Sequence, residues 1–245
     1  CFKLPQIVEQ PGLGVSAEAA SVALWRVQQK YFAKANEFEG LVLAGMFTHG
    51  PGYVHTIKPL SDLVSLKGKK IRIGGGVQSD LGKRLGITPI AAPGSKVYEM
   101  LQQGVIDGVF MPIGEQKALR LSEVAPNVLM VPGGMYLGSF SIFLNPDFLA
   151  SIGKKDRDAI MSVSGEKLSA LAGRLWDEND TVGYAHAKKN GVKLTEVPAD
   201  SALAKEFEKF SKGMHHDWIK SVKSRNIDAK AALKELTQIA QSYGK

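Results

Sequence analysis

The chain has a single cysteine and no long apolar run. Cys1 is the only cysteine among 245 residues, so we expect no internal disulfide and no cysteine-based metal site. No stretch approaches the roughly eighteen uninterrupted apolar residues of a membrane-spanning helix, and we expect none. The first residues, CFKLPQIVEQPG, have neither the basic head nor the apolar run of a signal peptide. We therefore expect either that an export signal has been removed or that there never was one.

The excess of positive charge does not have the pattern of a nucleic-acid-binding surface. The 31 Lys and Arg residues outnumber the 24 Asp and Glu residues, which gives a formal net charge of +7. Basic residues stand beside acidic ones, as in KKDRD and KEFEKFSK, and no basic run is interleaved with aromatic side chains. We expect no nucleic-acid partner and a mild positive field that favours anionic solutes.

Motifs for catalysis and for cofactor or metal binding are also absent. The sequence has no HExxH, no GxSxG and no P-loop, and a dinucleotide pattern starting at Gly74 fails at Ser79. His215 and His216 are adjacent, so on a helix they point about 100° apart and form a poor chelate. We therefore predict no catalytic residue, no cofactor and no metal ligand.

Periodicity and turn residues predict an α/β fold. The predicted strands are 40–47, 53–58, 69–73, 87–92, 105–111, 127–134, 139–145 and 191–198, and the predicted helices are 17–35, 79–85, 95–103, 154–189 and much of the chain after 203. We expect Ser16 and Ser95 to cap helices and Gly104 to end one. Residues 154–189 are predicted to form one long or slightly broken helix, from apolar residues that recur along it: Ile160, Val163, Leu168, Leu171, Leu175 and Val182. The alternation of strands and helices through 40–112 is typical of parallel βαβ units.

One cation stands inside a predicted strand. In LKGKKIRIGGGVQSD, Arg72 lies between Ile71 and Ile73, one residue before the strand meets three glycines. Arginine is rarely buried without a partner, and ligands of α/β sheets collect at the carboxyl ends of strands. Arg72 therefore predicts an anion-binding site, since its guanidinium can hold a carboxylate with two parallel hydrogen bonds. The alternative is an ion pair with a buried acid such as Asp107.

Three segments together resemble one family of transport proteins. LKGKKIRI, LGITPIAAPGSKVYEMLQQGVIDGVFMP and SFSIFLNPDFLASI, in this order, resemble the solute-binding proteins of tripartite ATP-independent periplasmic (TRAP) transporters. The resemblance implies a two-lobed α/β fold, similar to other periplasmic binding proteins, with a long interlobe helix. It implies a cleft that traps an organic carboxylate for delivery to membrane permease subunits. It also implies a periplasmic location, a signal peptide that has been removed, and no enzymatic activity.

The resemblance also divides the chain. It assigns residues 1–50 to the remainder of the first lobe and 51–138 to the second lobe with the ligand arginine. Residues 139–190 return to the first lobe through the long connecting helix, and 191–245 form a C-terminal strand and helices. In the family a segment like FKLP follows a complete opening portion, so we expect the first lobe to be incomplete in this chain.

By resemblance, Arg72 is the arginine that holds the carboxylate of the ligand. The other predicted ligand-binding residues lie at or near strand ends and loops: His49, Tyr53, His55, Gly74, Tyr98, Phe110, Met111, Tyr136 and Phe140. The alternative for Tyr98 is core packing, because a predicted helix carries it.

Departures from the family pattern bear on the ligand. Met111 stands where the family often has asparagine, Gly94 where it often has an aromatic residue, and Lys96 in place of a glutamate. An apolar wall beside Arg72 leaves hydroxyl groups unpaired, so we expect a monocarboxylate with an aliphatic or aromatic body rather than a sugar acid. The alternative is that histidines and Tyr136 supply enough polar contacts for a dicarboxylate or sugar acid.

Two other classes of function stay open. One is an enzyme of similar architecture that acts on a small organic acid, with Arg72 binding the substrate and a nearby histidine as base. It is less favoured, because no nucleophile, base and orienting group occur at a plausible spacing. The other is the effector-sensing domain of a DNA-binding regulator. A signal peptide upstream of Cys1 would separate transport from regulation.

Overall fold

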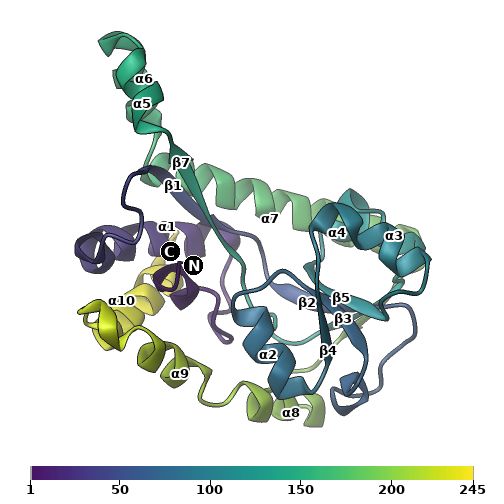
Figure 1. Cartoon of the computed structure of the whole chain (residues 1–245). Coiled ribbons are helices and arrows are strands. Elements are labelled where there is room, and N and C mark those ends of the chain that lie inside the picture. The colour runs from purple at the N-terminus through teal and green to yellow at the C-terminus, as the bar shows by residue number, and fades with distance from the viewer. Residues whose placement is uncertain (1, 245) are drawn as a thin grey trace.

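Two sheets and one long helix organise the chain (Figure 1). The computed structural model describes residues 2–244, so Cys1 lies outside the described residues. Six strands form one sheet in the order β4-β3-β5-β2-β6-β8, and β1 pairs with β7 in a second sheet. The strands are β1 (Val42–Thr48), β2 (Gly52–Thr56), β3 (Lys70–Ile73), β4 (Thr88–Ala91), β5 (Gly108–Pro112), β6 (Asn127–Met130), β7 (Ser139–Leu144) and β8 (Lys193–Glu196). The mixed α/β architecture is as predicted.

The helices cover the sheets and extend beyond them. They are α1 (Ala17–Val27), α2 (Val77–Leu85), α3 (Val97–Gln102), α4 (Glu115–Ala118), α5 (Pro146–Ser151), α6 (Lys154–Val163), α7 (Glu166–Lys189), α8 (Ala202–Ser211), α9 (Met214–Ser221) and α10 (Ala229–Ser242). In Figure 1, α5 and α6 stand out from the rest of the molecule. Within the part of the chain that the structure describes, no helix combines the length and the apolar character needed to cross a bilayer.

The six-stranded sheet is mixed rather than parallel throughout. β3 pairs parallel with β4 and β5, as βαβ alternation predicts. β2, however, lies antiparallel between β5 and β6. β1 belongs to the other sheet, where Val42 lies opposite Leu144 of β7. The prediction of parallel units is therefore right for β3 to β5 and wrong for β1 and β2.

Local signals fix several helix ends. The Ser16 side chain accepts a hydrogen bond from Ala19 N at 3.1 Å and starts α1, as predicted. Gly104 has φ +68°, the left-handed backbone that favours glycine, just after α3. Ser95 does not cap α3, and that prediction is wrong. It lies inside a 3-10 turn, Gly94–Lys96, which makes the first hydrogen bonds before the helix begins.

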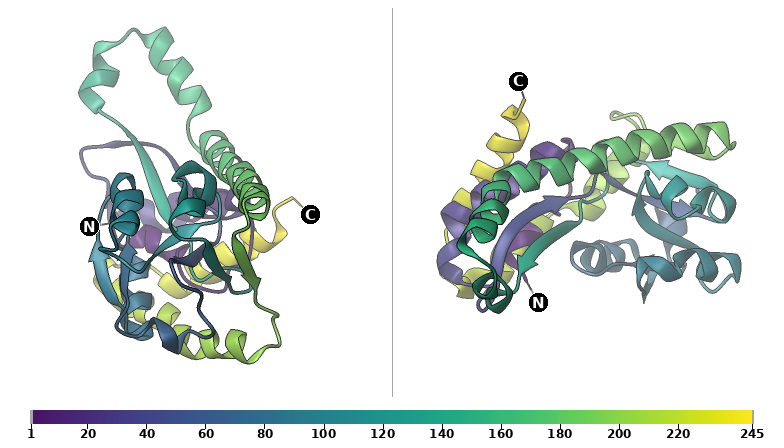
Figure 2. Two further views of the ribbon diagram at one scale, coloured as in Figure 1. Left: turned by 90° about the vertical axis from the view of Figure 1, so that its right-hand side faces the viewer. Right: turned by 90° about the horizontal axis from the view of Figure 1, so that it is seen from above.

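The long helix α7 packs against α1 and β1 at one end and against α4 and β8 at the other. Figure 2 shows α7 running the length of the molecule. Its close approach depends on two glycines. A Cβ at Gly173 would lie 2.6 Å from Ala17 O, and a Cβ at Gly183 would lie 2.3 Å from Gly114 Cα. Small residues thus let α7 pack closely against α1 at one end and against the turn at Gly114 at the other.

The face of α7 that is buried differs from the one its apolar pattern suggests. Its buried residues are small: Ser169, Gly173, Gly183 and Ala187. Leu171, Leu175 and Val182 are 43%, 53% and 45% exposed. The predicted long or slightly broken helix 154–189 is broken between α6 and α7, at Gly165 with φ +78°.

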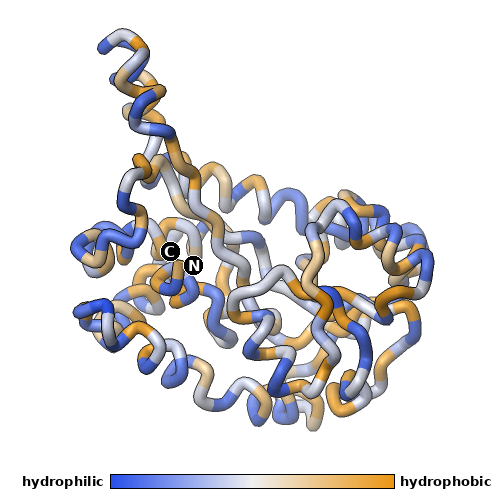
Figure 3. Tube along the Cα trace, in the orientation of Figure 1, coloured by the Kyte–Doolittle hydropathy of each residue, from blue (hydrophilic) through white to orange (hydrophobic). Residues whose placement is uncertain are grey.

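The six-stranded sheet and helix α1 belong to separate hydrophobic cores. One cluster packs the six-stranded sheet against α2 and α8, and another joins α1 to α9 and α10. A third covers the opposite face of β5 with α3. The C-terminal segment therefore contributes to both cores. Strand β8 belongs to the six-stranded sheet and α8 packs against it, whereas α9 and α10 pack with α1. Apolar and polar stretches alternate along the chain in Figure 3, including on the protruding α5 and α6.

Candidate functional site

A cavity of about 570 Å³ opens at the carboxyl ends of β3 and β5. The turn after β3, the turn before α3, the end of β5, the start of β7 and the side of α7 all contribute to it. It is lined by Glu9, His49, Arg72, Gly74, Gly75, Gly76, Gln78, Gly94, Ser95, Met111, Pro112, Glu115, Leu119, Tyr136, Leu137, Gly138, Ser139, Phe140 and Trp176. Its volume is within the range of small-molecule sites.

Arg72 is the cation of this cavity. Its side chain is buried, with the residue 8% exposed, and its Nε donates to Ala92 O at 2.8 Å. Nη1 lies 3.7 Å from Met111 Sδ, a weak acceptor. Among residues 2–244, no carboxylate oxygen lies within 4.0 Å of its guanidinium. Burial lowers the pKa of Arg72, which is the sign of a cation without enough compensation.

The alternative of an ion pair with Asp107 does not hold. Asp107 Oδ2 accepts a hydrogen bond from Lys70 N at 2.8 Å, at the opposite end of β3. The Arg72 side chain instead extends toward the carboxyl end. Its nitrogens lie 3.7 Å from the position of a Cβ built at Gly74, so the glycine leaves room in front of the guanidinium.

Aromatic rings form one wall of the cavity. The rings of Phe140 and Trp176 are nearly parallel, with an interplanar angle of 5° and centroids 6.3 Å apart. Phe47 stacks on Phe140 at 5.0 Å. His49 lies 5.9 Å from Trp176 and 5.5 Å from Tyr136, where it makes an edge contact. This wall offers a flat apolar surface to a solute.

Two polar side chains of the wall are buried. Desolvation lowers the pKa of His49 to about 4, so the ring is neutral near pH 7 and its Nδ1 can donate to Gly50 O at 2.5 Å. Tyr136 is 2% exposed, and its hydroxyl has no hydrogen-bond partner among the described residues. A buried hydroxyl without a partner is costly and uncommon. The hydroxyl of Tyr136 is therefore an unpaired donor beside the cavity.

Two acids line the cavity as well. Glu9 accepts hydrogen bonds from Val77 N at 3.1 Å, Ser139 N at 3.2 Å and Ser139 Oγ at 2.6 Å. Desolvation raises the pKa of Glu9, and the hydrogen bonds from Ser139 and Val77 oppose that shift. Glu115 is 8% exposed and makes no side-chain hydrogen bond in residues 2–244. Desolvation raises the pKa of Glu115, and the charge of Arg72 opposes it.

Six of the ten predicted site residues line this cavity: His49, Arg72, Gly74, Met111, Tyr136 and Phe140. The other four lie elsewhere. His55 is wholly buried between Met111 O and Gln116, and Phe110 lies in the core on the opposite face of β5. Tyr53 packs beside Ile113 and Val128. His55, Phe110 and Tyr53 do not line the cavity.

Tyr98 is the fourth residue that does not reach the cavity. Its hydroxyl donates to Glu123 Oε2 at 2.8 Å, and Arg120 lies 4.9 Å from the centre of its ring. The tyrosine therefore belongs to a surface cluster, which also differs from the core packing considered as its alternative. Contact of any of these residues with a ligand stays a prediction.

Several lining residues are not predicted from the sequence, among them Glu9, Glu115, Leu119 and Trp176. Trp176 is far from Arg72 in sequence, on a helix whose apolar positions gave no sign of which face meets the cavity. Glu115 had one usable signal, because it closely follows Pro112 at the carboxyl end of β5.

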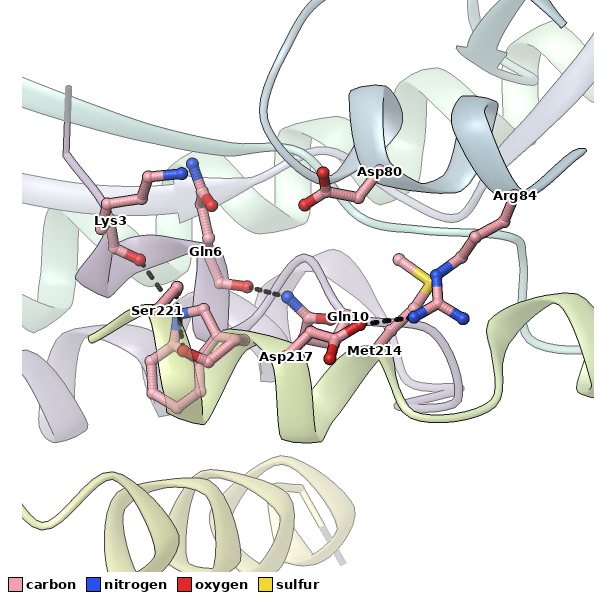
Figure 4. A pocket seen from close by; sticks show the side chains of 9 residues that line it. Lys3, Gln6, Gln10, Asp80, Arg84, Met214, Asp217 and Ser221 are labelled. Carbon is pink, nitrogen blue, oxygen red and sulfur yellow. Dashed lines mark hydrogen bonds and ion pairs between the residues drawn. The ribbon is translucent and has the colours of Figure 1, made fainter. Parts of the chain in front are cut away.

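A second, smaller hollow lies between α2 and α9 (Figure 4). Its volume is about 60 Å³, and none of its lining residues lines the cavity around Arg72. Some of its polar groups are paired with one another: Trp218 Nε1 donates to Lys3 O at 3.0 Å, and Arg84 Nη2 donates to Asp217 Oδ2 at 2.5 Å. Gln10 Oε1 has no hydrogen-bond partner among the described residues. The space suits a water molecule or two rather than an organic solute. In residues 2–244, no group of three or more potential ligands could hold a metal ion.

The family model of the bacterial extracellular solute-binding proteins, family 7 (DctP), matches residues 16–222. The chain therefore belongs to this family, the solute-binding proteins of TRAP transporters, which are periplasmic. The resemblance predicted from the sequence is confirmed. A curated relative, the outer membrane transporter protein TsaT of Comamonas testosteroni, is 33% identical over 233 residues, which are 94% of this chain and 68% of the relative.

Solved structures agree with this assignment. A TRAP periplasmic solute-binding protein from Bordetella bronchiseptica with bound (R)-mandelate and (S)-mandelate is 34% identical, with a TM-score of 0.93 over 98% of this chain and 76% of that one. A marine metagenome TRAP solute-binding protein specific for aromatic acid ligands, in complex with 3-hydroxybenzoate, is 28% identical, with a TM-score of 0.88 over 100% of this chain and 76% of that one. Both of these relatives are TRAP solute-binding proteins.

Proposed function

We propose that this protein captures an aromatic monocarboxylate in the periplasm and delivers it to the membrane subunits of a TRAP transporter. The single observation that carries the proposal is Arg72. It is a buried guanidinium at the carboxyl end of β3, faces a cavity and has no carboxylate partner in residues 2–244. A buried cation needs an anion, and a solute carboxylate supplies one with matching geometry.

The other walls favour an aromatic body. Phe140 and Trp176 present stacked rings, and Met111 and Leu119 add aliphatic surface. The unpaired hydroxyl of Tyr136, a residue that lines the same cavity as Arg72, would donate to the same carboxylate. The two relatives with bound mandelate and bound 3-hydroxybenzoate support an aromatic acid as the class of ligand.

Calorimetric titration of the purified protein with benzoate and mandelate tests the proposal. Wild-type protein should bind at least one of them, and Arg72→Lys should bind it about ten- to a hundredfold more weakly. An ammonium cannot reproduce the bidentate fork, and each charge-assisted hydrogen bond contributes about 1.5–3 kcal/mol. The matched control is Arg120→Lys, since Arg120 is exposed and pairs only with Glu123 among described acids. It should leave the affinity unchanged.

Two outcomes would contradict the proposal. One is undiminished affinity in a folded Arg72→Lys variant, which would remove Arg72 from the site. The other is stabilisation of the protein only by C4 dicarboxylates or uronic acids in a thermal-shift panel. A ligand that binds only the folded state raises the melting temperature, so the panel reports the preferred class directly.

A further inference from the structure

Glu115 is a buried acid that the carboxylate-binding role of the cavity does not explain. It is 8% exposed, lines the same cavity as Arg72, and its side chain makes neither a hydrogen bond nor an ion pair with any residue in 2–244. Placing a carboxyl in a site for carboxylates is unfavourable by itself, because like charges repel. The position therefore calls for a partner on the solute.

The backbone around Glu115 is held firmly. Gly114 N donates to Asp180 Oδ1 at 2.9 Å, which ties the start of α4 to α7. A Cβ at Gly183 would lie 2.3 Å from Gly114 Cα, so the helix and the turn are in direct backbone contact. Glu115 follows at the first position of α4. The backbone position of Glu115 is therefore fixed relative to α7.

The chemistry of the cavity narrows the kind of partner. An ionised carboxylate is an acceptor only, so it needs a donor. A ligand ammonium would share the cavity with Arg72, whose charge opposes a second cation. A second ligand carboxylate would meet Glu115 and be repelled. A neutral hydroxyl can donate to Glu115 without either conflict.

We propose that Glu115 determines specificity by accepting a hydrogen bond from a hydroxyl group of the bound acid. The site then prefers hydroxylated aromatic monocarboxylates over their unhydroxylated counterparts, and rejects aromatic dicarboxylates. This inference rests on the proposed function, since it requires Arg72 to hold the carboxylate. A hydrogen bond to a charged acceptor corresponds to a preference of about ten- to a hundredfold.

The experiment compares affinities within two pairs of acids, mandelate with phenylacetate and 3-hydroxybenzoate with benzoate, by calorimetry. In wild-type protein at least one hydroxylated acid should bind ten times or more tighter than its partner. Glu115→Leu should reduce that ratio to about one while still binding the unhydroxylated acid. Glu115→Gln should lower the ratio several-fold and should bind isophthalate better than wild type does, because it removes the negative charge. Glu123→Gln, an exposed acid of the same segment, should keep the wild-type ratio.

The following results would overturn the role of Glu115. A ratio near one in both pairs for wild type, or an unchanged ratio in Glu115→Leu, would overturn the role of Glu115 while benzoate binding left the proposed function standing. Tightest binding of 3-(aminomethyl)benzoate would overturn it too, and would assign Glu115 to a cation. Failure of wild-type protein to bind any of these acids would overturn the proposed function and this inference together.

Discussion

His55 provides a test of how burial sets the stability of this protein. It is fully buried in β2, with 0% of its surface exposed, and both ring nitrogens are engaged. Nε2 lies 2.9 Å from Met111 O, and Nδ1 lies 2.8 Å from Gln116 Nε2. Gln116 Nε2 also donates to Ala125 O at 3.2 Å, which fixes the orientation of the amide. Nδ1 must therefore accept, Nε2 must carry the hydrogen, and the ring is neutral.

A second proton on Nδ1 would face a donor and would place a charge in the core. Desolvation accordingly lowers the pKa of His55 from 6.5 to about 4. The unfolded chain then binds the proton more readily than the folded chain, so the contribution to stability is complete above pH 6.5 and is lost as the pH falls toward 4. A shift of this size corresponds to about 3 kcal/mol in total, of which about 2 kcal/mol is lost by pH 5.

Urea unfolding at pH 7 and pH 5 measures this loss. His55→Gln should be less stable than wild type at pH 7 by about 1 kcal/mol, because one hydrogen bond is weakened. It should lose about 2 kcal/mol less than wild type between the two pH values. His216→Gln changes an exposed histidine and should lose as much free energy of unfolding between pH 7 and pH 5 as wild type does. A His55 ring that titrates near pH 6.5 in the folded protein by NMR would refute the reasoning, and so would a full loss in His55→Gln.

Three further predictions concern α7. Burial raises the pKa of Asp180 to about 7, so the folded chain retains a proton that the unfolded chain releases above pH 4. The wild-type free energy of unfolding should therefore fall between pH 5 and pH 8. In urea unfolding, Asp180→Asn should lose roughly 1–2 kcal/mol less than wild type over this range. Gly183→Ala should destabilise the protein by about 1–3 kcal/mol despite the helix propensity of alanine, because its Cβ would lie 2.3 Å from Gly114 Cα. Trp176→Leu should weaken benzoate binding about three- to tenfold in calorimetry through loss of the ring beside Phe140, with an unchanged melting temperature.

The strand pattern shows where sequence reasoning was sufficient and where it was not. Arg72 could be singled out because its signal is local: a cation inside an apolar strand that ends in glycine. Phe110 and Met111 could not both reach the cavity, because successive residues of a strand point to opposite faces. Met111 lines the cavity, and Phe110 packs in the core with Val54 on the other face. Alternation alone could have excluded one of the two, but could not say which.

The helix α7 shows a different limit. Periodicity identified it, but the residues that repeat are largely exposed, and small residues make the contacts. Leu171 and Leu175 could not reveal this, because an amphipathic pattern identifies the apolar face of a helix but not whether another element packs against that face. Trp176 was missed for the same reason. The position of Trp176 beside Phe140 depends on how closely α7 packs at Gly173 and Gly183, which is a property of the tertiary structure.

The placement of the other acids supports the proposal that Arg72 binds the anion in this cavity. The start of α2 follows the glycine turn after β3, and free amide groups at a helix start attract anions. Glu9 already accepts from Val77 N there, at 3.1 Å, and its charge opposes a second anion at the same amide. Asp107 and Asp180 are likewise engaged by Lys70 N and Gly114 N. The chain therefore satisfies its helix start and turns with its own carboxylates, and the Arg72 guanidinium is left without a carboxylate partner among residues 2–244.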